Sequence, residues 1–452
     1  MKKISTQLLT FFAAFLVILS CNKDDDAVGL NDIVLSATAT TVQVGGTTTF
    51  SVLSNTNVDL TPNATFYVNN SQIESNIFIP EAAGTYIVVA KYTTDNQTLV
   101  SNEIIINATA IPTTEVTIFD EVVFYDGYAA TVNQPVPAGA IRKSNASYVT
   151  KLTPAQIASF SNKLKIQVTI GALCDNYDRI GGVFVNMVDK GTAFTEENVA
   201  KRLEVGRFIT PFMNKNIAPT EVDYVFETDN LALLFNDPAI NDAYDFWIEL
   251  NVFGVPYAAQ EQVSGCQGRN DVFEGTLKFM STDETYDHVN QLFVPIVTYK
   301  EMNNYNASGT DVIGQTVRTY TFDIPSSITN AKLYVITSNH GANNNGEEYN
   351  RREHFIYFDN ALVDTYVPGG KSCEPYRVYN TQGNGIYGNA PRSLATWLSF
   401  SNWCPGDIIP IRTYDLLNIN QGSHSFKIEV PDAVFADGQG YFPVSVYIQG
   451  DL

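Results

Sequence analysis

A short acidic segment carries side chains well suited to chemistry. The run from Cys174 to Arg179, Cys-Asp-Asn-Tyr-Asp-Arg, places Asp175, Asp178, an aromatic ring and a guanidinium next to one another. An adjacent Arg can hold a carboxylate in its ionised form and fix its orientation. Such clusters also occur as turns with an Asp cap and a surface ion pair. The segment therefore indicates either an acid–base site or a solvated turn.

Two further segments place acidic residues beside aromatic or basic ones. Residues 246–252, Phe-Trp-Ile-Glu-Leu-Asn-Val, alternate as a strand does, with Glu249 on the face opposite the apolar residues. Glu348 lies in the charged run 346–354, which precedes the apolar run 355–358. Each acid is either exposed to solvent or part of the floor of a cleft.

Several other catalytic motifs are missing from the sequence. It contains neither a Cys-x-x-Cys pair, nor His-x-His or His-Glu-x-x-His spacing, nor a Gly-x-Ser-x-Gly turn. Residues 369–372, Gly-Gly-Lys-Ser, end like a phosphate-binding loop, but Thr365 stands where that motif needs its first Gly. We therefore expect no metal and no other cofactor.

The composition excludes some classes of partner. The 48 acidic residues outnumber the 27 Lys and Arg residues, which gives a net charge of −21. This charge opposes binding to nucleic acid and adhesion to anionic lipid through basic patches. With 44% apolar residues the chain can bury a core, and its many aromatic, Val and Thr residues predict a β-rich protein. We expect a monomer.

The N-terminus has the features of an export signal. Lys2 and Lys3 precede an apolar run over residues 8–19 that is too short to cross a membrane. Residues 18–21, Ile-Leu-Ser-Cys, resemble a bacterial lipobox, in which the Cys is lipidated, and three Asp residues follow at 24–26. We predict a signal peptide over 1–20, a lipid anchor at Cys21 and an acidic tether over 21–32. An ordinary secretory peptide is the alternative.

This signal predicts an outer-membrane lipoprotein that is exposed at the cell surface or, alternatively, faces the periplasm. The acidic residues after Cys21 resemble the surface-export signal of some lipoproteins of Gram-negative bacteria. Such a location is oxidising, so the four remaining cysteines are expected to form two disulfides, for which three pairings exist.

The remaining chain reads as three β domains. Short β runs and polar turns over 33–108, with Tyr86 shortly after a Gly, are typical of an immunoglobulin-like sandwich. A linker follows over 109–116, and β-like segments with Gly, Asn and Pro turns then continue to the end. A polar stretch at 281–288 divides this part into two domains of jelly-roll size, 117–283 and 284–452.

From about Thr117 onward the chain resembles the peptide-N-glycosidase F family. Five segments match the family's motifs in order along the chain. They are the run 174–179, the string Glu-Val-Gly-Arg-Phe-Ile-Thr-Pro at 204–211, Glu249 on its strand, His340 followed by Glu348-Tyr349, and Trp-Cys-Pro-Gly at 403–406. The resemblance implies an all-β protein with two eight-stranded jelly rolls packed side by side and a site along their interface.

The resemblance also implies roles for individual residues. It makes Asp178 the principal catalytic acid, with Glu348 and Glu249 as the other two acids. Substrate contacts would come from Arg179 and Asp175 and from the side chains that line the cleft, Tyr177, His340, Tyr349 and Trp403. It implies a Cys373–Cys404 disulfide, and Cys174 and Cys266 are then expected to pair.

The chain departs from the family's pattern at several positions. The small disulfide that brackets the family's catalytic Glu is absent, since Gly346 and Asn350 occupy those places. An Arg expected near the Trp-Cys-Pro-Gly signature is Phe400 here. Trp is common in the family at four positions that carry other residues in this chain, namely Tyr177, Asn251, Ser338 and Tyr349.

The implied activity is hydrolysis of the amide bond between Asn and the innermost GlcNAc of N-linked glycans on glycopeptides and glycoproteins. One carboxylate would act as base and a neutral one as acid, with no metal required. We expect Asp178 to activate or position the water and to engage the linkage, Glu348 to act across the site, and Glu249 to orient the substrate. The alternatives are a glycan-binding lipoprotein without catalysis and a glycoside hydrolase that uses a carboxylate pair.

Overall fold

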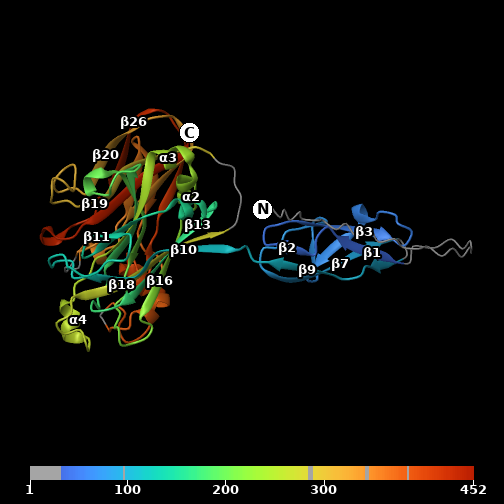
Figure 1. Ribbon diagram of the computed structural model, residues 1–452, viewed down its shortest axis with the longest axis horizontal. Coiled ribbons are helices and arrows are strands. Elements are labelled where there is room, and N and C mark those ends of the chain that lie inside the picture. The colour runs from blue at the N-terminus through green and yellow to red at the C-terminus, as the bar shows by residue number, and fades with distance from the viewer. Residues whose placement is uncertain (1–31, 95–96, 283–288, 342–345, 384–385) are drawn as a thin grey trace, which may run out of the picture. The chain divides into compact units, whose positions relative to one another are not determined.

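The computed structural model describes residues 32–94, 97–282, 289–341, 346–383 and 386–452. The chain divides between Ile111 and Pro112 into two compact units, both built mainly of β-strands (Figure 1). The predicted signal peptide, the lipidation site Cys21 and all but the last residue of the predicted tether lie outside the described residues. None of the described helices combines the length and the apolar character that a membrane span requires.

The first unit is an immunoglobulin-like sandwich of two sheets. One sheet has the strand order β1 (Ile33–Ala37), β3 (Thr48–Ser54), β6 (Ile77–Phe78). The other has the order β2 (Thr41–Gln43), β9 (Ile104–Thr109), β7 (Gly84–Thr93), β4 (Thr65–Val68), β5 (Ser71–Ile73), with β8 (Thr98–Val100) paired to β7. Alternate side chains such as Phe50, Val52 and Val88 fill the core between the sheets. The Tyr86 hydroxyl donates to the Ala82 carbonyl at 2.8 Å, as a corner tyrosine does.

The second unit begins with a jelly-roll sandwich. Its outer sheet has the order β10 (Thr113–Tyr125), β18 (Asp271–Thr282), β13 (Lys163–Ala172), β16 (Glu221–Glu227). Its inner sheet has the order β11 (Ala140–Ser144), β12 (Ser147–Lys151), β17 (Tyr244–Val252), β14 (Ile180–Asp189), β15 (Val199–Ile209), β24 (Ile408–Ile409). Strand β24 comes from much later in the chain and pairs with β15 through Arg207 and Phe208.

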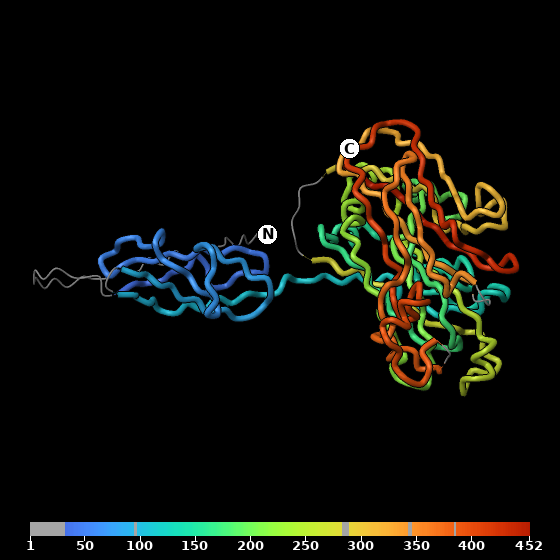
Figure 2. The backbone as a smooth tube through the Cα atoms, turned by 180° about the vertical axis from the view of Figure 1, so that it is seen from behind, coloured from blue at the N-terminus to red at the C-terminus, as the bar shows by residue number. Residues whose placement is uncertain are grey.

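A second jelly-roll sandwich completes this unit. One sheet has the order β19 (Gln291–Met302), β27 (Phe442–Asp451), β21 (Ile328–Thr337), β25 (Arg412–Ile419). The other has the order β20 (Val317–Ile324), β26 (Gly422–Glu429), β22 (His354–Phe358), β23 (Ala361–Tyr366). Buried side chains including Leu333, Val446 and Phe426 form its core. The two sandwiches lie side by side within the unit (Figure 2).

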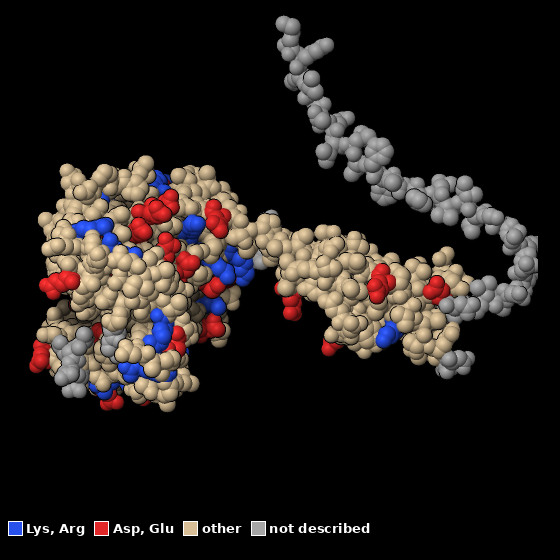
Figure 3. All heavy atoms as spheres, turned by 90° about the horizontal axis from the view of Figure 1, so that it is seen from below, with Lys and Arg blue, Asp and Glu red and all other residues tan. Residues whose placement is uncertain are grey.

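In the part of the chain that the structure describes, five short α-helices connect the strands: α1 (Pro154–Ala158), α2 (Asp229–Asn236), α3 (Pro238–Ala243), α4 (Tyr257–Gln262) and α5 (Leu394–Phe400). Helix α1 begins with a capping box, in which Thr153 and Gln156 satisfy each other's backbone amides. On the faces shown in Figure 3, acidic and basic side chains are scattered among uncharged residues. Charge is therefore not gathered into one basic or acidic surface on those faces.

The pattern of apolar residues in strands β14 and β17 determines which face of the inner sheet points into the core of the first sandwich. On β17 the apolar residues Phe246, Ile248 and Leu250 point into the core of the first sandwich, so Glu249 points the other way. Strand β14 is buried along nearly its whole length, because its second face is covered as well. The second face of the inner sheet therefore lies toward the other sandwich.

A buried ion pair lies where the two sandwiches meet. Arg207 and Glu204 on β15 are both buried and form a two-pronged pair, with two N–O distances of 2.7 Å. Arg207 Nη1 also donates to the Pro443 carbonyl of the second sandwich at 2.8 Å, and the Ser445 hydroxyl donates to Glu204. Because a buried charge is costly unless it is fully partnered, these contacts restrict the sandwiches to one alignment.

We expect Arg207→Ala to lower the free energy of unfolding of the second unit by about 3–5 kcal/mol, because it leaves the Glu204 charge buried without its partner. All three Trp residues lie in this unit, so Trp fluorescence during urea unfolding follows it selectively. The control is Lys332→Ala, which removes an exposed ion pair with Asp415 and should cost less than about 1 kcal/mol. Equal losses in the two variants would contradict a structural role for the buried pair.

Candidate active site

A cavity of about 460 Å³ lies where β14 and β17 of the first sandwich face loops of the second. The second sandwich contributes three aromatic residues to its wall, Tyr299, His340 and Tyr441. The first sandwich contributes Tyr128, Asp178, Arg179, Ile180, Gly182, Phe184, Arg202, Asn251 and Phe253. The cavity therefore combines ionisable groups with a largely aromatic wall, as sites for small polar ligands often do.

Asp178 is the carboxylic acid in the cavity wall, and its environment keeps it protonated. Its Oδ2 is buried and has no hydrogen-bond partner among the described residues. Burial and the charge of the nearby Glu348 raise the pKa of Asp178 to about 8, against the weaker opposing effect of Arg179. At neutral pH this side chain thus holds a proton that it could donate.

Glu348 lies beside the cavity on the short 3₁₀ turn Glu347–Tyr349. The Gly341 amide lies 3.3 Å from its Oε2, and the Tyr349 hydroxyl is a further partner. Burial nevertheless raises the pKa of Glu348 above its usual value. Because the charge of Glu348 helps to raise the pKa of Asp178, the two carboxyl groups, one from each sandwich, lie close enough to interact.

Hydrogen bonds hold the turn that carries Glu348. The Asn350 side chain donates to the Gly346 carbonyl at 2.6 Å and so closes the turn at the two positions where the family's small disulfide is missing. The Asn402 side-chain amide donates to the carbonyls of Glu347, Glu348 and Asn350 at 2.7–3.1 Å. The position of Glu348 is therefore fixed from both sides of the turn.

The segment 174–179 is organised around Asp175. The Asp175 carboxylate is fully buried and accepts hydrogen bonds from Arg179 Nε at 2.6 Å and from the backbone amides of Tyr177 and Val255. Arg179 lines the cavity, whereas Asp175 does not. The expected substrate contact of Asp175 is thus replaced by a different role, which is to orient Arg179. Tyr177 is 40% exposed, and its ring lies 5.6 Å from that of Phe212, also outside the cavity wall.

Glu249 lies behind the cavity wall and does not face the groove with the other two acids. Its carboxylate is 1% exposed and is held by Arg202 at 3.1 Å and by Lys143 at 3.0 Å. Ser147 and Asn186 also donate to it, at 2.9 and 3.1 Å. Although burial opposes ionisation, Arg202 and Lys143 hold the pKa of Glu249 below its usual value.

Glu249 therefore acts on the cavity through Arg202. Arg202 is a lining residue, and its guanidinium lies 3.8 Å from the centre of the Phe184 ring. Of the three acids expected to share one groove, Asp178 lines the cavity, Glu348 lies beside it, and Glu249 anchors a lining cation from behind the wall.

His340 lines the cavity from the second sandwich, and Trp403 packs against it without lining the cavity itself. The two rings lie 5.8 Å apart, and the Trp403 indole N–H donates to the Asn339 carbonyl at 2.9 Å. His340 forms a β-bridge with Tyr441, which brings both residues to the cavity. Gly440 permits this approach, because a Cβ at that position, where φ is +88°, would lie 2.5 Å from the His340 carbonyl oxygen.

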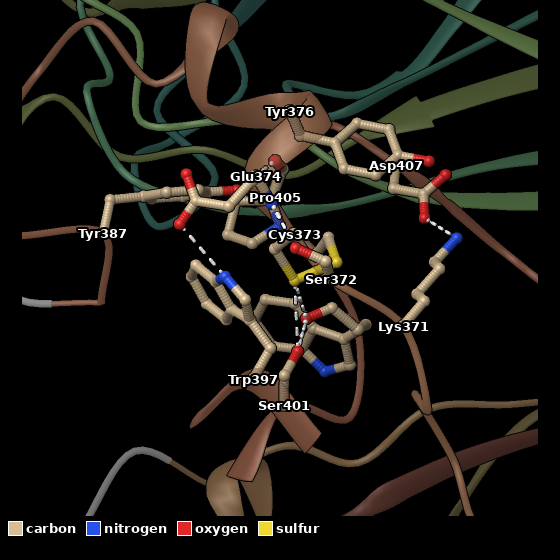
Figure 4. The surroundings of a disulfide bond; sticks show 12 residues. Lys371, Ser372, Cys373, Glu374, Tyr376, Tyr387, Trp397, Ser401, Pro405 and Asp407 are labelled. Atoms are coloured by element: carbon tan, nitrogen blue, oxygen red, sulfur yellow. Dashed lines mark hydrogen bonds and ion pairs between the residues drawn. A yellow bond between two sulfur atoms is a disulfide. The ribbon is translucent and has the colours of Figure 1, made fainter. Parts of the chain in front are cut away.

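Two disulfides support the loops around the site. Cys174, which directly precedes Asp175, is bonded to Cys266, and Cys373 is bonded to Cys404. Figure 4 shows the second bond, with the Trp397 indole N–H directed at Glu374, to which it donates at 3.0 Å. The segment between these cysteines brings Phe400 to 6.2 Å from the ring of Tyr349. Phe400 therefore packs beside the turn that carries Glu348.

Several lining residues carry no functional signal in the sequence. Arg202 stands in a strand whose polar positions look like ordinary solvent-facing ones, and the aromatic residues are unremarkable in a chain that is 12% aromatic. The lining residues missed in this way are Tyr128, Phe184, Arg202, Phe253, Tyr299 and Tyr441.

The raised pKa of Asp178 predicts that this residue destabilises the fold increasingly as the pH rises from about 4 to about 8. The unfolded chain releases the Asp178 proton near pH 4, whereas the folded protein keeps it up to about pH 8. The wild type should therefore lose stability relative to Asp178→Asn as the pH rises from 4 to 8, and the deficit should remain constant above pH 8. We expect it to reach at least about 2 kcal/mol in urea unfolding.

The control for this measurement is Asp189→Asn at the end of β14, which changes an exposed acid. Its stability difference from the wild type should not grow over the same pH range. A difference for Asp178→Asn that is independent of pH would contradict the protonated state of this side chain.

Comparison with known proteins agrees with this architecture. The solved structure of PNGF-II is 15% identical, with a TM-score of 0.55 over 90% of this chain and 88% of that one. The structure described as PNGase F, a glycosylasparaginase from Flavobacterium meningosepticum, is also 15% identical, covers 75% of this chain and 96% of its own, and has a TM-score of 0.48. No curated protein matches the sequence.

Family models match most of the second unit. The model described as peptide-N-glycosidase F, N terminal, matches residues 115–268. The model described as peptide-N-glycosidase F, C terminal, matches residues 304–449. The match thus includes Asp178, Glu249, His340 and Glu348 in their order along the chain. The chain belongs to the peptide-N-glycosidase F family.

Proposed function

We propose that this protein hydrolyses the amide bond between Asn and the innermost GlcNAc of N-linked glycans on glycopeptides and glycoproteins. The observation that carries the proposal is Asp178 in the cavity wall with Glu348 beside it: Asp178 is buried, lacks a hydrogen-bond partner for Oδ2 among the described residues and has a pKa of about 8. A site that holds one neutral and one ionised carboxyl group can supply an acid and a base at the same pH.

In the proposed mechanism Glu348 is the base and Asp178 is the acid. Ionised Glu348 takes a proton from a water molecule as its oxygen attacks the carbonyl carbon of the Asn side chain. Asp178 donates its proton to the linkage nitrogen as the C–N bond breaks, which yields an Asp residue on the peptide and a glycosylamine. The glycosylamine then decays to free glycan and ammonia. Transfer of the proton from Glu348 to Asp178 restores the starting state once the new Asp side chain has ionised.

This assignment refines the expectation from sequence. The resemblance alone leads to the expectation that Asp178 activates or positions the water. The pKa of about 8 for Asp178 favours the role of proton donor, and we therefore assign the activation of water to Glu348.

The surrounding residues suit a glycan bound at its asparagine. Arg179, held by Asp175, and Arg202, held by Glu249, present fixed cationic donors to the cavity. Tyr128 is 72% exposed at the cavity, and its ring lies 5.2 Å from that of Phe253. Such aromatic surfaces can cover the apolar faces of sugar rings while the polar groups bind hydroxyls.

Mass spectrometry of a glycopeptide incubated in H₂¹⁸O tests the proposal. We expect Asn to become Asp carrying one ¹⁸O, and we expect Asp178→Asn to lower the rate at least about a hundredfold, because it removes the proton donor. The matched control is Glu353→Gln, an exposed acid shortly after the catalytic turn, which should retain the wild-type rate.

Each other product identifies a different function. A peptide that keeps one GlcNAc on Asn would identify a glycoside hydrolase. An unchanged glycopeptide that nevertheless binds the protein would identify a glycan-binding protein, as the Phe400 and Asn251 departures suggest. Normal deglycosylation by Asp178→Asn would refute the assigned proton donor.

We also propose that the protein is an outer-membrane lipoprotein at the cell surface. The support is the sequence Ile-Leu-Ser-Cys at 18–21 with the acidic residues that follow it. An acidic tether and a first domain would then hold the enzyme away from the membrane.

Detergent phase partitioning tests the lipid anchor. The full-length protein produced in a Gram-negative host should enter the detergent phase, because its acylated N-terminus is apolar. Cys21→Ser, which lacks the acceptor thiol, should stay in the aqueous phase. Partitioning of both proteins into the aqueous phase would contradict lipidation.

A further inference from the structure

A chain of buried polar groups leads from the contact between the sandwiches to His340. It begins at the Glu204–Arg207 pair, in which the third guanidinium nitrogen of Arg207, Nη1, donates to the Ser338 hydroxyl at 3.0 Å. The same hydroxyl lies 2.8 Å from Nε2 of His340. Ser338 is 3% exposed, and His340 is 8% exposed and lines the cavity. The ion pair is thus connected to the cavity through one hydroxyl group.

The direction of each hydrogen bond follows from the atoms available. A guanidinium can only donate, so Ser338 Oγ accepts from Arg207. The hydroxyl hydrogen then needs an acceptor, and His340 Nε2 is the partner that the described residues provide for it. If Nε2 carried the ring proton instead, the buried hydroxyl hydrogen would have no acceptor among those residues, which is unfavourable. Nε2 therefore accepts, and a neutral imidazole must carry its proton on Nδ1.

We propose that Ser338 is a positioning residue that holds neutral His340 in its Nδ1–H form, so that the ring offers a fixed N–H donor to a substrate oxygen in the cavity. Among the described residues, none hydrogen-bonds to His340 Nδ1, so none of them competes with a substrate oxygen for that N–H. Burial and the charge of Arg207 support the neutral form, since they lower the pKa of His340 to about 3. A fixed donor that needs no reorientation is effective where negative charge develops on oxygen. The catalytic part of this proposal rests on the proposed amidase function.

Nitrogen NMR of the protein labelled with ¹⁵N-histidine tests the tautomer without any assay of activity. The chain has only four His residues, and the signals lost in His340→Gln assign the ring at the site. We expect His340 Nε2 to resonate as an unprotonated ring nitrogen and Nδ1 as a protonated one, and we expect this pattern to stay unchanged between pH 6 and 8. Protonation at Nε2, or titration in that range, would overturn the proposal.

Ser338→Ala tests the role of the hydroxyl. The ring should shift toward the Nε2–H form, and kcat on a glycopeptide should fall about tenfold with little change in KM, because the lost interaction serves the transition state. Ser338→Thr keeps a hydroxyl and should restore both the tautomer and kcat. If Ser338→Ala leaves the tautomer unchanged, the proposed positioning role is wrong.

A matched control separates positioning from a general disturbance of the buried network. Ser445→Ala removes a different hydroxyl, which donates to Glu204 but does not contact His340. It should leave the His340 tautomer as in the wild type, and an equal shift in both variants would overturn the specific role of Ser338. A wild-type protein with the expected tautomer but no deglycosylation would refute the amidase function and leave the tautomer assignment standing.

Discussion

The structure depends on the buried Glu204–Arg207 pair at the contact between the two sandwiches. A charge without water must be matched by partners at fixed positions, and here the partners come from β15, from Ser338 and from residues 443–445. Sliding one sandwich against the other would break several of these bonds together. Since Asp178 belongs to the first sandwich and Glu348 to the second, the same constraint that aligns the sandwiches also brings the two acids together.

Two buried carboxyl groups at the site differ in protonation, because their neighbours shift their pKa values in opposite directions. Glu249 is surrounded by Arg202, Lys143 and two neutral donors, so it stays ionised despite its burial. Asp178 has a weaker cationic neighbour in Arg179 and feels the charge of Glu348, so it keeps its proton. Arg179 is drawn to Asp175, which accepts its Nε–H at 2.6 Å. Three carboxylates that do not line the cavity, those of Glu249, Asp175 and Glu348, thus set the orientation or protonation of the side chains that do line it.

The sequence was most informative where a signal is local. Alternation over residues 246–252 predicts the β17 strand and the side on which Glu249 lies. The residue types in the segment 174–179 indicate a turn there. What alternation could not show is that β17 has a second covered face, which turns an apparently solvent-facing Glu249 into a buried one. Aromatic residues such as Tyr128 and Tyr441 join the cavity from loops that are far apart along the chain, so no spacing rule connects them. The pairing of β24 with β15 is non-local in the same way.

The position of β24 has a consequence for how this pair of sandwiches can be inherited. Strand β24 lies in the part of the sequence that otherwise forms the second sandwich, yet it pairs with β15 at the edge of the inner sheet of the first sandwich. A recombination event that separates the two sandwiches would leave β15 at an open sheet edge, where unpaired backbone groups promote aggregation. Shuffling of this gene into new multidomain arrangements therefore has to move both sandwiches together, whereas a module such as the first unit, whose contacts are largely its own, can be gained or lost in one step.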